Sequence, residues 1–119
     1  MANQDAILLF IDDRPVLSSL QFSLTVEGFQ AVDGATDGMD PALAGALIVD
    51  QNYWGDGLTA LRHLRSEGCE VPAILLATNP TAALRARAKA EGAELIEKPL
   101  LDAELSRAIR GLFEKREVA

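Results

Sequence analysis

Short apolar runs alternate along the chain with longer segments in which apolar residues recur every three or four positions. The runs predict five strands, at about 6–11, 29–32, 46–50, 71–77 and 94–97. Residues 46–50 are almost continuously apolar, as in a strand that is covered on both faces. Because parallel strands are joined by crossovers that are usually helices, the alternation predicts a single α/β domain over residues 1–119.

Capping residues mark the predicted helices between the strands. Pro15 suits the first turn of the first helix, and Gly28 suits its C-terminal cap. Asp56 is placed to cap a helix that ends at Gly68, and Asp102 is placed to cap the last helix. The apolar stripes predicted to face the core are Leu17, Leu20 and Leu24, then Leu58, Leu61 and Leu64, and finally Leu105, Ala108, Ile109 and Leu112. The helix expected at 82–91 has Leu84 as its single large apolar residue and should be weakly anchored.

The crossover between the second and third strands is unusually short. Residues 39–45 leave too little room for an amphipathic helix once Pro41 and Gly45 take their positions. We therefore expect one or two helical turns there, and a flank of the sheet that is thinly covered.

Charged residues stand where several strands end. Asp12 and Asp13 follow the first strand, Asp50 ends the third, and Lys98 follows the fifth. In a doubly wound sheet of order 2-1-3-4-5, the ligand site lies beyond the carboxyl ends of strands one and three. We expect the three carboxylates to meet there, with Lys98 within reach of Asp50.

Such a cluster suits phosphoryl transfer. Three adjacent carboxylates repel one another unless a cation is present, and Mg²⁺ accepts carboxylates together with a phosphoryl oxygen. Asp50 would attack phosphorus, Asp12 and Asp13 would hold the metal, and Lys98 would balance the charge of the product. The alternative interpretation is a set of solvated loop charges.

The spacing of these residues resembles that of CheY-like receiver domains of two-component response regulators. The matching positions are Asp12-Asp13, Asp50, Gly57-Leu58 and Lys98-Pro99. The resemblance implies a flavodoxin-like doubly wound five-stranded parallel sheet of order 2-1-3-4-5, here with a truncated second helix. It also implies that Asp50 accepts a phosphoryl group from a histidine kinase or phosphotransfer protein, that the backbone carbonyl of Asn52 contacts Mg²⁺, and that the Lys98–Pro99 peptide is cis.

Three positions depart from the family pattern. Ala77 stands where the family has Thr or Ser, with Thr78 one step later, and Leu95 stands where an aromatic switch residue is expected. We therefore expect coupled switching through these positions to be absent. Trp54 stands where proline is common, in a loop that is one residue shorter than usual. Its ring is either a lid or partner contact, or is packed on its own loop.

Composition limits the other possibilities. The net charge of −7 argues against direct binding to nucleic acid, and no apolar run approaches the length of a membrane span. The N-terminus has no secretory pattern, so a cytoplasmic location is expected. A single cysteine, Cys69, excludes an internal disulfide and a cysteine-based metal site. His63 lies off its leucine stripe and is expected on a solvated face.

Two functions remain. The first is a stand-alone receiver that signals through an unknown protein target after Mg²⁺-dependent phosphorylation. Such a receiver is not an enzyme, apart from catalysing its own phosphorylation and dephosphorylation. A second copy is a candidate partner, docking on the fourth helix with Arg85, Arg87 and Lys89, the fifth strand and the fifth helix. The second function is an interaction module that does not depend on phosphorylation. A flavin-phosphate site is disfavoured because Asp12-Asp13 would repel the phosphate.

Overall fold

A computed structural model of the chain describes residues 6–35, 38, 40–98 and 104–118, with side chains as far as residue 114. Five parallel strands form one sheet in the order β2-β1-β3-β4-β5, as predicted. The strands are β1 (Ala6–Phe10), β2 (Gln30–Asp33), β3 (Ala46–Asp50), β4 (Ala73–Ala77) and β5 (Ala93–Glu97). β4 begins later than predicted because Pro72 has no N–H to give to the ladder.

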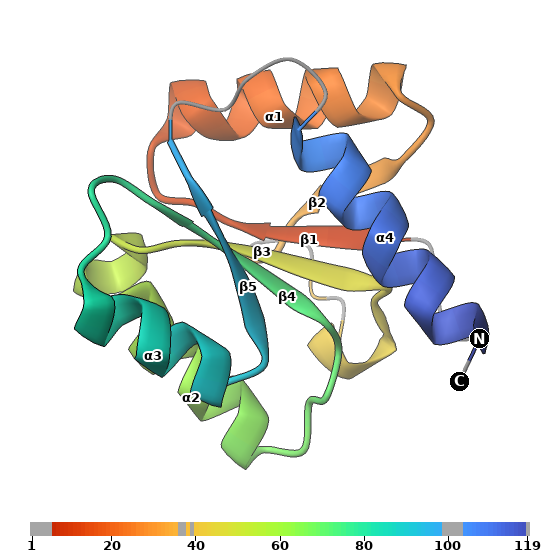
Figure 1. Cartoon of the computed structure of the whole chain (residues 1–119). Coiled ribbons are helices and arrows are strands. Elements are labelled where there is room, and N and C mark those ends of the chain that lie inside the picture. Colours follow the sequence, from red (N-terminus) through yellow and green to blue (C-terminus); the bar gives the residue numbers. More distant parts are fainter. Residues whose placement is uncertain (1–5, 36–37, 39, 99–103, 119) are drawn as a thin grey trace.

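Helices cover both faces of the sheet (Figure 1). One face carries α1 (Arg14–Val26) and α4 (Glu104–Val118), and the other carries α2 (Gly57–Ser66) and α3 (Ala82–Ala90). Side chains of the central strands alternate between the two layers. Ile7 and Leu9 pack with α1 and α4, whereas Leu8 lies in the other layer with Leu58 of α2.

Local sequence sets the helix ends. The Asp13 side chain accepts a hydrogen bond from the Val16 N–H and caps α1, with Pro15 in the first turn. The chain leaves α1 and α2 through Gly28 and Gly68, whose φ angles are +95° and +97°. The predicted cap of the last helix, Asp102, lies outside the described residues.

The expected second helix is reduced to the 3₁₀ turn η1 (Pro41–Leu43), which confirms the truncation. Because that helix is not formed, the helices expected as the fourth and fifth are the ones labelled α3 and α4. On the α2/α3 face, the Tyr53 ring from the 3₁₀ turn η2 (Tyr53–Gly55) packs edge-on against Phe10, with the ring centroids 5.6 Å apart. A loop aromatic thus forms part of the core layer under α2 and α3. Among the described residues, no helix combines the length and the apolar character needed to cross a bilayer.

Candidate functional site

Asp50 and Lys98 meet at the carboxyl end of the sheet. The Lys98 Nζ donates to Asp50 Oδ2 at 2.7 Å, and Asp50 Oδ1 accepts the N–H of Asn52 at 2.9 Å. The side chain of Asp50 is 12% exposed and that of Lys98 is 31% exposed. The Lys98 N–H donates to the Ala77 carbonyl at 2.7 Å, which holds the end of β5 beside β4. The expected contact between the carboxylate and the ammonium is therefore present.

A glycine permits the chain to turn closely around Asp50. A Cβ at Gly57, the first residue of α2, would lie 2.0 Å from the carbonyl oxygen of Asp50 and 2.9 Å from a methyl group of Val49. The Gly57 N–H instead donates to the Gln51 carbonyl at 2.8 Å. The absence of a side chain therefore lets α2 begin directly against the end of β3.

Asp12 is joined to the loop that follows β3. Its Oδ2 accepts the N–H of Trp54 at 2.7 Å, and Trp54 has a left-handed backbone with φ +50°. A proline at this position could not donate such a bond. The Trp54 residue is 80% exposed, although its ring centroid lies 6.3 Å from that of Tyr53 in the same loop. Its role as a lid or partner contact stays a prediction.

Asp13 does not join the other carboxylates. Within the described parts of the chain, no three acidic, histidine or cysteine side chains gather in a way that could hold a metal ion. The three-carboxylate cluster expected from Asp12, Asp13 and Asp50 is therefore not formed in the structure, and their role as metal ligands stays a prediction. The physical reason is that the Asp13 carboxylate caps α1 by accepting the Val16 N–H at 3.2 Å.

The structure adds a further carboxylate at the end of β2. Asp33 is 7% exposed, and its Oδ2 lies 3.2 Å from Nη1 of Arg14. Its Oδ1 accepts the Ala35 N–H at 2.9 Å. This residue was missed because the strand was predicted to end one residue earlier, at Val32.

The candidate switch positions have distinct surroundings. Ala77 is fully buried, and its methyl group offers no hydrogen bond. Leu95 is partly buried against the core layer under α2 and α3. Thr78 is exposed, and its N–H donates to the Gln51 Oε1 at 2.5 Å. No sequence pattern indicated this role for Gln51.

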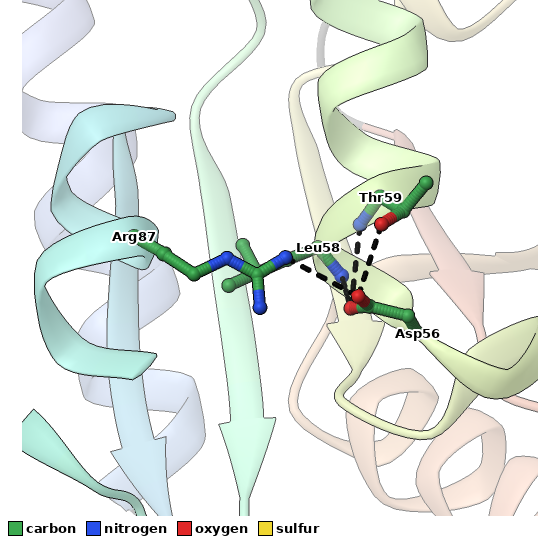
Figure 2. A network of polar contacts seen from close by, with 4 residues as sticks. All are labelled: Asp56, Leu58, Thr59 and Arg87. Carbon is green, nitrogen blue, oxygen red and sulfur yellow. Dashed lines mark hydrogen bonds and ion pairs between the residues drawn. The ribbon is translucent and has the colours of Figure 1, made fainter. Parts of the chain in front are cut away.

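Asp56 joins the start of α2 to α3 (Figure 2). Its Oδ1 accepts the N–H groups of Leu58 and Thr59, while its Oδ2 accepts the Thr59 hydroxyl at 3.0 Å and Arg87 Nη2 at 3.2 Å. Burial raises the pKa of the Asp56 carboxyl, but the bonds from Thr59 and Arg87 more than offset this and hold its pKa below the usual value.

The basic side chains of α3 are part of a candidate docking surface. They are exposed, but two of them bind acidic side chains of neighbouring elements: Arg87 pairs with Asp56, and Arg85 pairs with Glu97 of β5 at 3.6 Å. His63, expected on a solvated face, is largely exposed and lies 3.6 Å from Glu67 on the same helix.

Burial also affects the phenol of Tyr53. The residue is 9% exposed, and its removal from water raises the pKa of the hydroxyl above its ordinary value. The negative charge of Asp12 raises it further. Tyr53 therefore stays neutral beside the carboxylates of the rim.

Comparisons with known proteins agree with this architecture. No protein-family model matches the sequence. Over 118 residues the chain is 33% identical to the transcriptional regulatory protein QseB of Haemophilus influenzae, with 92% of this chain and 53% of that protein covered. The chain thus spans about half the length of that relative.

Solved receiver domains share the fold. The crystal structure of FixJ-N is 25% identical, with a TM-score of 0.77 and 92% and 93% of the two chains covered. The receiver domain of NtrX from Brucella abortus is 19% identical, with a TM-score of 0.78 and 92% and 98% covered. The beryllofluoride-activated receiver domain dimer of NtrC4 is 20% identical, with a TM-score of 0.80 and 93% and 98% covered. The similarity to this relative and the shared fold together show that the chain has the architecture of the receiver domains of two-component response regulators.

Proposed function

We propose that this receiver domain accepts a phosphoryl group on Asp50 from a histidine kinase or a phosphotransfer protein and then signals through protein contacts. The observation that carries the proposal is the 2.7 Å contact between Lys98 Nζ and Asp50 Oδ2 at the end of β3. An ammonium at this distance balances one negative charge of a carboxylate and can also reach a phosphoryl group on it. Both residues line a hollow together with α1 and α4 side chains, among them Pro15, Ser19, Leu105 and Ser106.

The transfer needs little more than this placement. A carboxylate oxygen of Asp50 attacks the phosphorus of the donor, and the new O–P bond forms as the bond from phosphorus to the donor's histidine nitrogen breaks. The imidazole nitrogen leaves with the electron pair, and the imidazole leaves as a neutral group because its other nitrogen carries a proton. The Asp50 nucleophile acts as the carboxylate, so it needs no general base.

We further propose that Mg²⁺ assists, by neutralising phosphoryl oxygens when it is bound. The oxygens that suit it are the carboxylates of Asp12 and Asp50 and the backbone carbonyl of Asn52. One or two carboxylates are enough for this ion, so the use of Asp13 as a helix cap does not remove the fit. Asp12 has one carboxylate oxygen beyond the one that Trp54 binds.

The test is intact-mass spectrometry after incubation with a small phosphodonor, with MgCl₂ and with EDTA. Wild type should gain one phosphoryl group, and Asp50→Asn should gain none. Asp40→Asn is the matched control, because Asp40 caps η1 before β3 and not at the rim where Asp50 lies. A wild-type chain that gains no phosphoryl group would contradict the proposal.

A second candidate is a receiver-like module that binds partners without phosphorylation. It is favoured by the buried methyl group of Ala77 and by Leu95. Neither side chain has a hydroxyl that could bind a phosphoryl group or reorient when Asp50 is phosphorylated. Equal affinity of wild type and Asp50→Asn for a partner, with no added phosphoryl group in wild type, would support this alternative.

A second copy is the partner we propose for the surface made of α3, β5 and α4. The solved NtrC4 receiver domain is described as a beryllofluoride-activated dimer, which supports this proposal. Light scattering with and without beryllofluoride and Mg²⁺ measures the association. Constant monomer mass over the whole concentration range, in both conditions, would contradict it.

A further inference from the structure

Gln51 connects the phosphoacceptor strand to its neighbours. It follows Asp50 directly, and its own N–H donates to the Leu76 carbonyl at 2.9 Å. Its carbonyl accepts the N–H of Gly57, at the start of α2, at 2.8 Å. Its side-chain Oε1 accepts the N–H of Thr78 at 2.5 Å. One residue thus binds β4, α2 and the loop that follows β4.

Thr78 lies at the same rim as Asp50. Asp50 is paired with Leu76 in the parallel register, so the residues that follow Leu76 extend past the carboxylate. Neighbouring strands are about 4.8 Å apart, which keeps this segment close to the acceptor. The segment is held from both sides, because the Lys98 N–H binds the Ala77 carbonyl and Gln51 binds the Thr78 N–H.

A short loop connects Thr78 to α3. Asn79 has a left-handed backbone with φ +47°, and the Thr81 hydroxyl caps α3 by accepting the Leu84 N–H at 3.0 Å. Only Asn79 and Pro80 therefore separate Thr78, whose amide Gln51 binds, from Thr81, the cap of the helix. Because this connection is short, a displacement of Thr78 should also displace the start of α3.

We propose that Gln51 is a positioning residue that couples Asp50 to α3. Its side-chain carbonyl holds the Thr78 N–H in the resting domain, and a phosphoryl group on Asp50 takes that donor. A charged phosphoryl oxygen is a stronger acceptor than a neutral amide carbonyl, so the exchange favours the phosphorylated state. Release of Gln51 then repositions the loop and α3. This inference rests on the proposed function, and it supplies a route to α3 that uses neither Ala77 nor Leu95.

The test compares Gln51→Leu, which has no acceptor, with Gln51→Glu, which keeps one. Hydrogen exchange and chemical shifts of the Thr78 and Leu84 amides are followed by NMR, and the mass of each sample reports phosphorylation. Without phosphodonor, Gln51→Leu should exchange Thr78 about five- to tenfold faster than wild type, and Gln51→Glu should exchange it no faster than wild type, because a carboxylate is at least as strong an acceptor as an amide carbonyl. Gln21→Leu on α1 is the control for loss of a glutamine side chain and should leave Thr78 unchanged.

With phosphodonor, wild type and Gln51→Leu should gain the same mass, but the shift change at Leu84 should fall by at least about half in Gln51→Leu. Equal Leu84 responses in the two phosphorylated proteins, or equal Thr78 exchange without phosphodonor, would overturn the inference and leave the proposed function intact. No mass gain in wild type would overturn both, and the mass spectrum distinguishes these failures. Circular dichroism confirms that each variant is folded.

Discussion

The ammonium of Lys98 lies 2.7 Å from Oδ2 of Asp50, although the two residues are 48 positions apart in the chain. Each is held by backbone at the end of a strand: Asp50 by its pairing with β4, and Lys98 by its N–H bond to Ala77. The contact therefore depends on the strand order and not on a flexible loop. A charge pair that the fold positions in this way needs little rearrangement to balance further negative charge beside Asp50.

Substitution of Lys98 tests the strength of this pair. Lys98→Met should lower the free energy of unfolding by about 1–2 kcal/mol, because the largely buried carboxylate of Asp50 loses its counter-charge. Asp50→Asn removes the need for that charge, so the loss caused by Lys98→Met should be smaller in the Asp50→Asn background. Urea unfolding of the four proteins in a double-mutant cycle measures the coupling. Strictly additive losses would show that the contact contributes nothing to stability.

The glycine at the start of α2 gives a second test. Gly57→Ala should destabilise the domain by about 1–3 kcal/mol, because its methyl group would overlap the Asp50 carbonyl and the backbone must shift. Gly111→Ala is the matched control: it lies within α4, with nothing within 4 Å of an added Cβ. It should be neutral or stabilising by up to about 1 kcal/mol. Thermal melts compare the two, and equal melting temperatures would contradict the close approach at Gly57.

The sequence predicted most of what depends on local backbone chemistry. Buried strands, the strand order and the cap at Asp56 follow from apolar runs and from residue types with known backbone preferences. The truncated second helix followed from chain length alone. These features require no knowledge of how distant side chains meet.

The sequence failed where a polar side chain had more than one available partner. Asp13 was assigned to a metal site, whereas in the structure one of its carboxylate oxygens accepts an N–H at the start of α1. The bond from Thr78 to Gln51 and the bond from Arg87 to Asp56 were not predicted, because the partners come from different elements. Their pairing depends on where the loops and α3 lie in three dimensions, which periodicity does not encode.

The lowered pKa of Asp56 makes the free energy of unfolding depend on pH in the acidic range. The Asp56 carboxyl binds its proton less readily in the folded domain than in the unfolded chain. Its negative charge therefore adds stability at a pH above the unfolded pKa, near 3.8, and this added stability is lost as the pH falls through the folded pKa. Asp56→Asn should therefore cost at most about 1 kcal/mol near pH 7, since both Asp56 and Arg87 are partly exposed and Asn also caps helices. The difference from wild type should shrink below about pH 4.

Urea unfolding between pH 3 and pH 7 measures this dependence. Arg87→Gln removes one of the contacts that lower the Asp56 pKa and should reproduce part of the effect. Because the pair is exposed to solvent, added salt should also reduce the difference. A difference that is constant across the pH range would show that the Asp56 charge does not contribute.

The raised pKa of Tyr53 predicts the opposite dependence, a loss of folding stability at alkaline pH. Burial raises the pKa of its phenol, so the folded domain keeps the proton more tightly than the unfolded chain. Stability is then unaffected below the unfolded pKa, near 10.0, and falls as the pH rises from there through the folded pKa. Tyr53→Phe keeps the ring that packs on Phe10 but has no proton to lose. Urea midpoints of the two proteins should run parallel from pH 8 to pH 9.5 and diverge above pH 10, with wild type falling faster. Parallel curves up to pH 11 would mean that the phenol is not protected from ionisation by the fold.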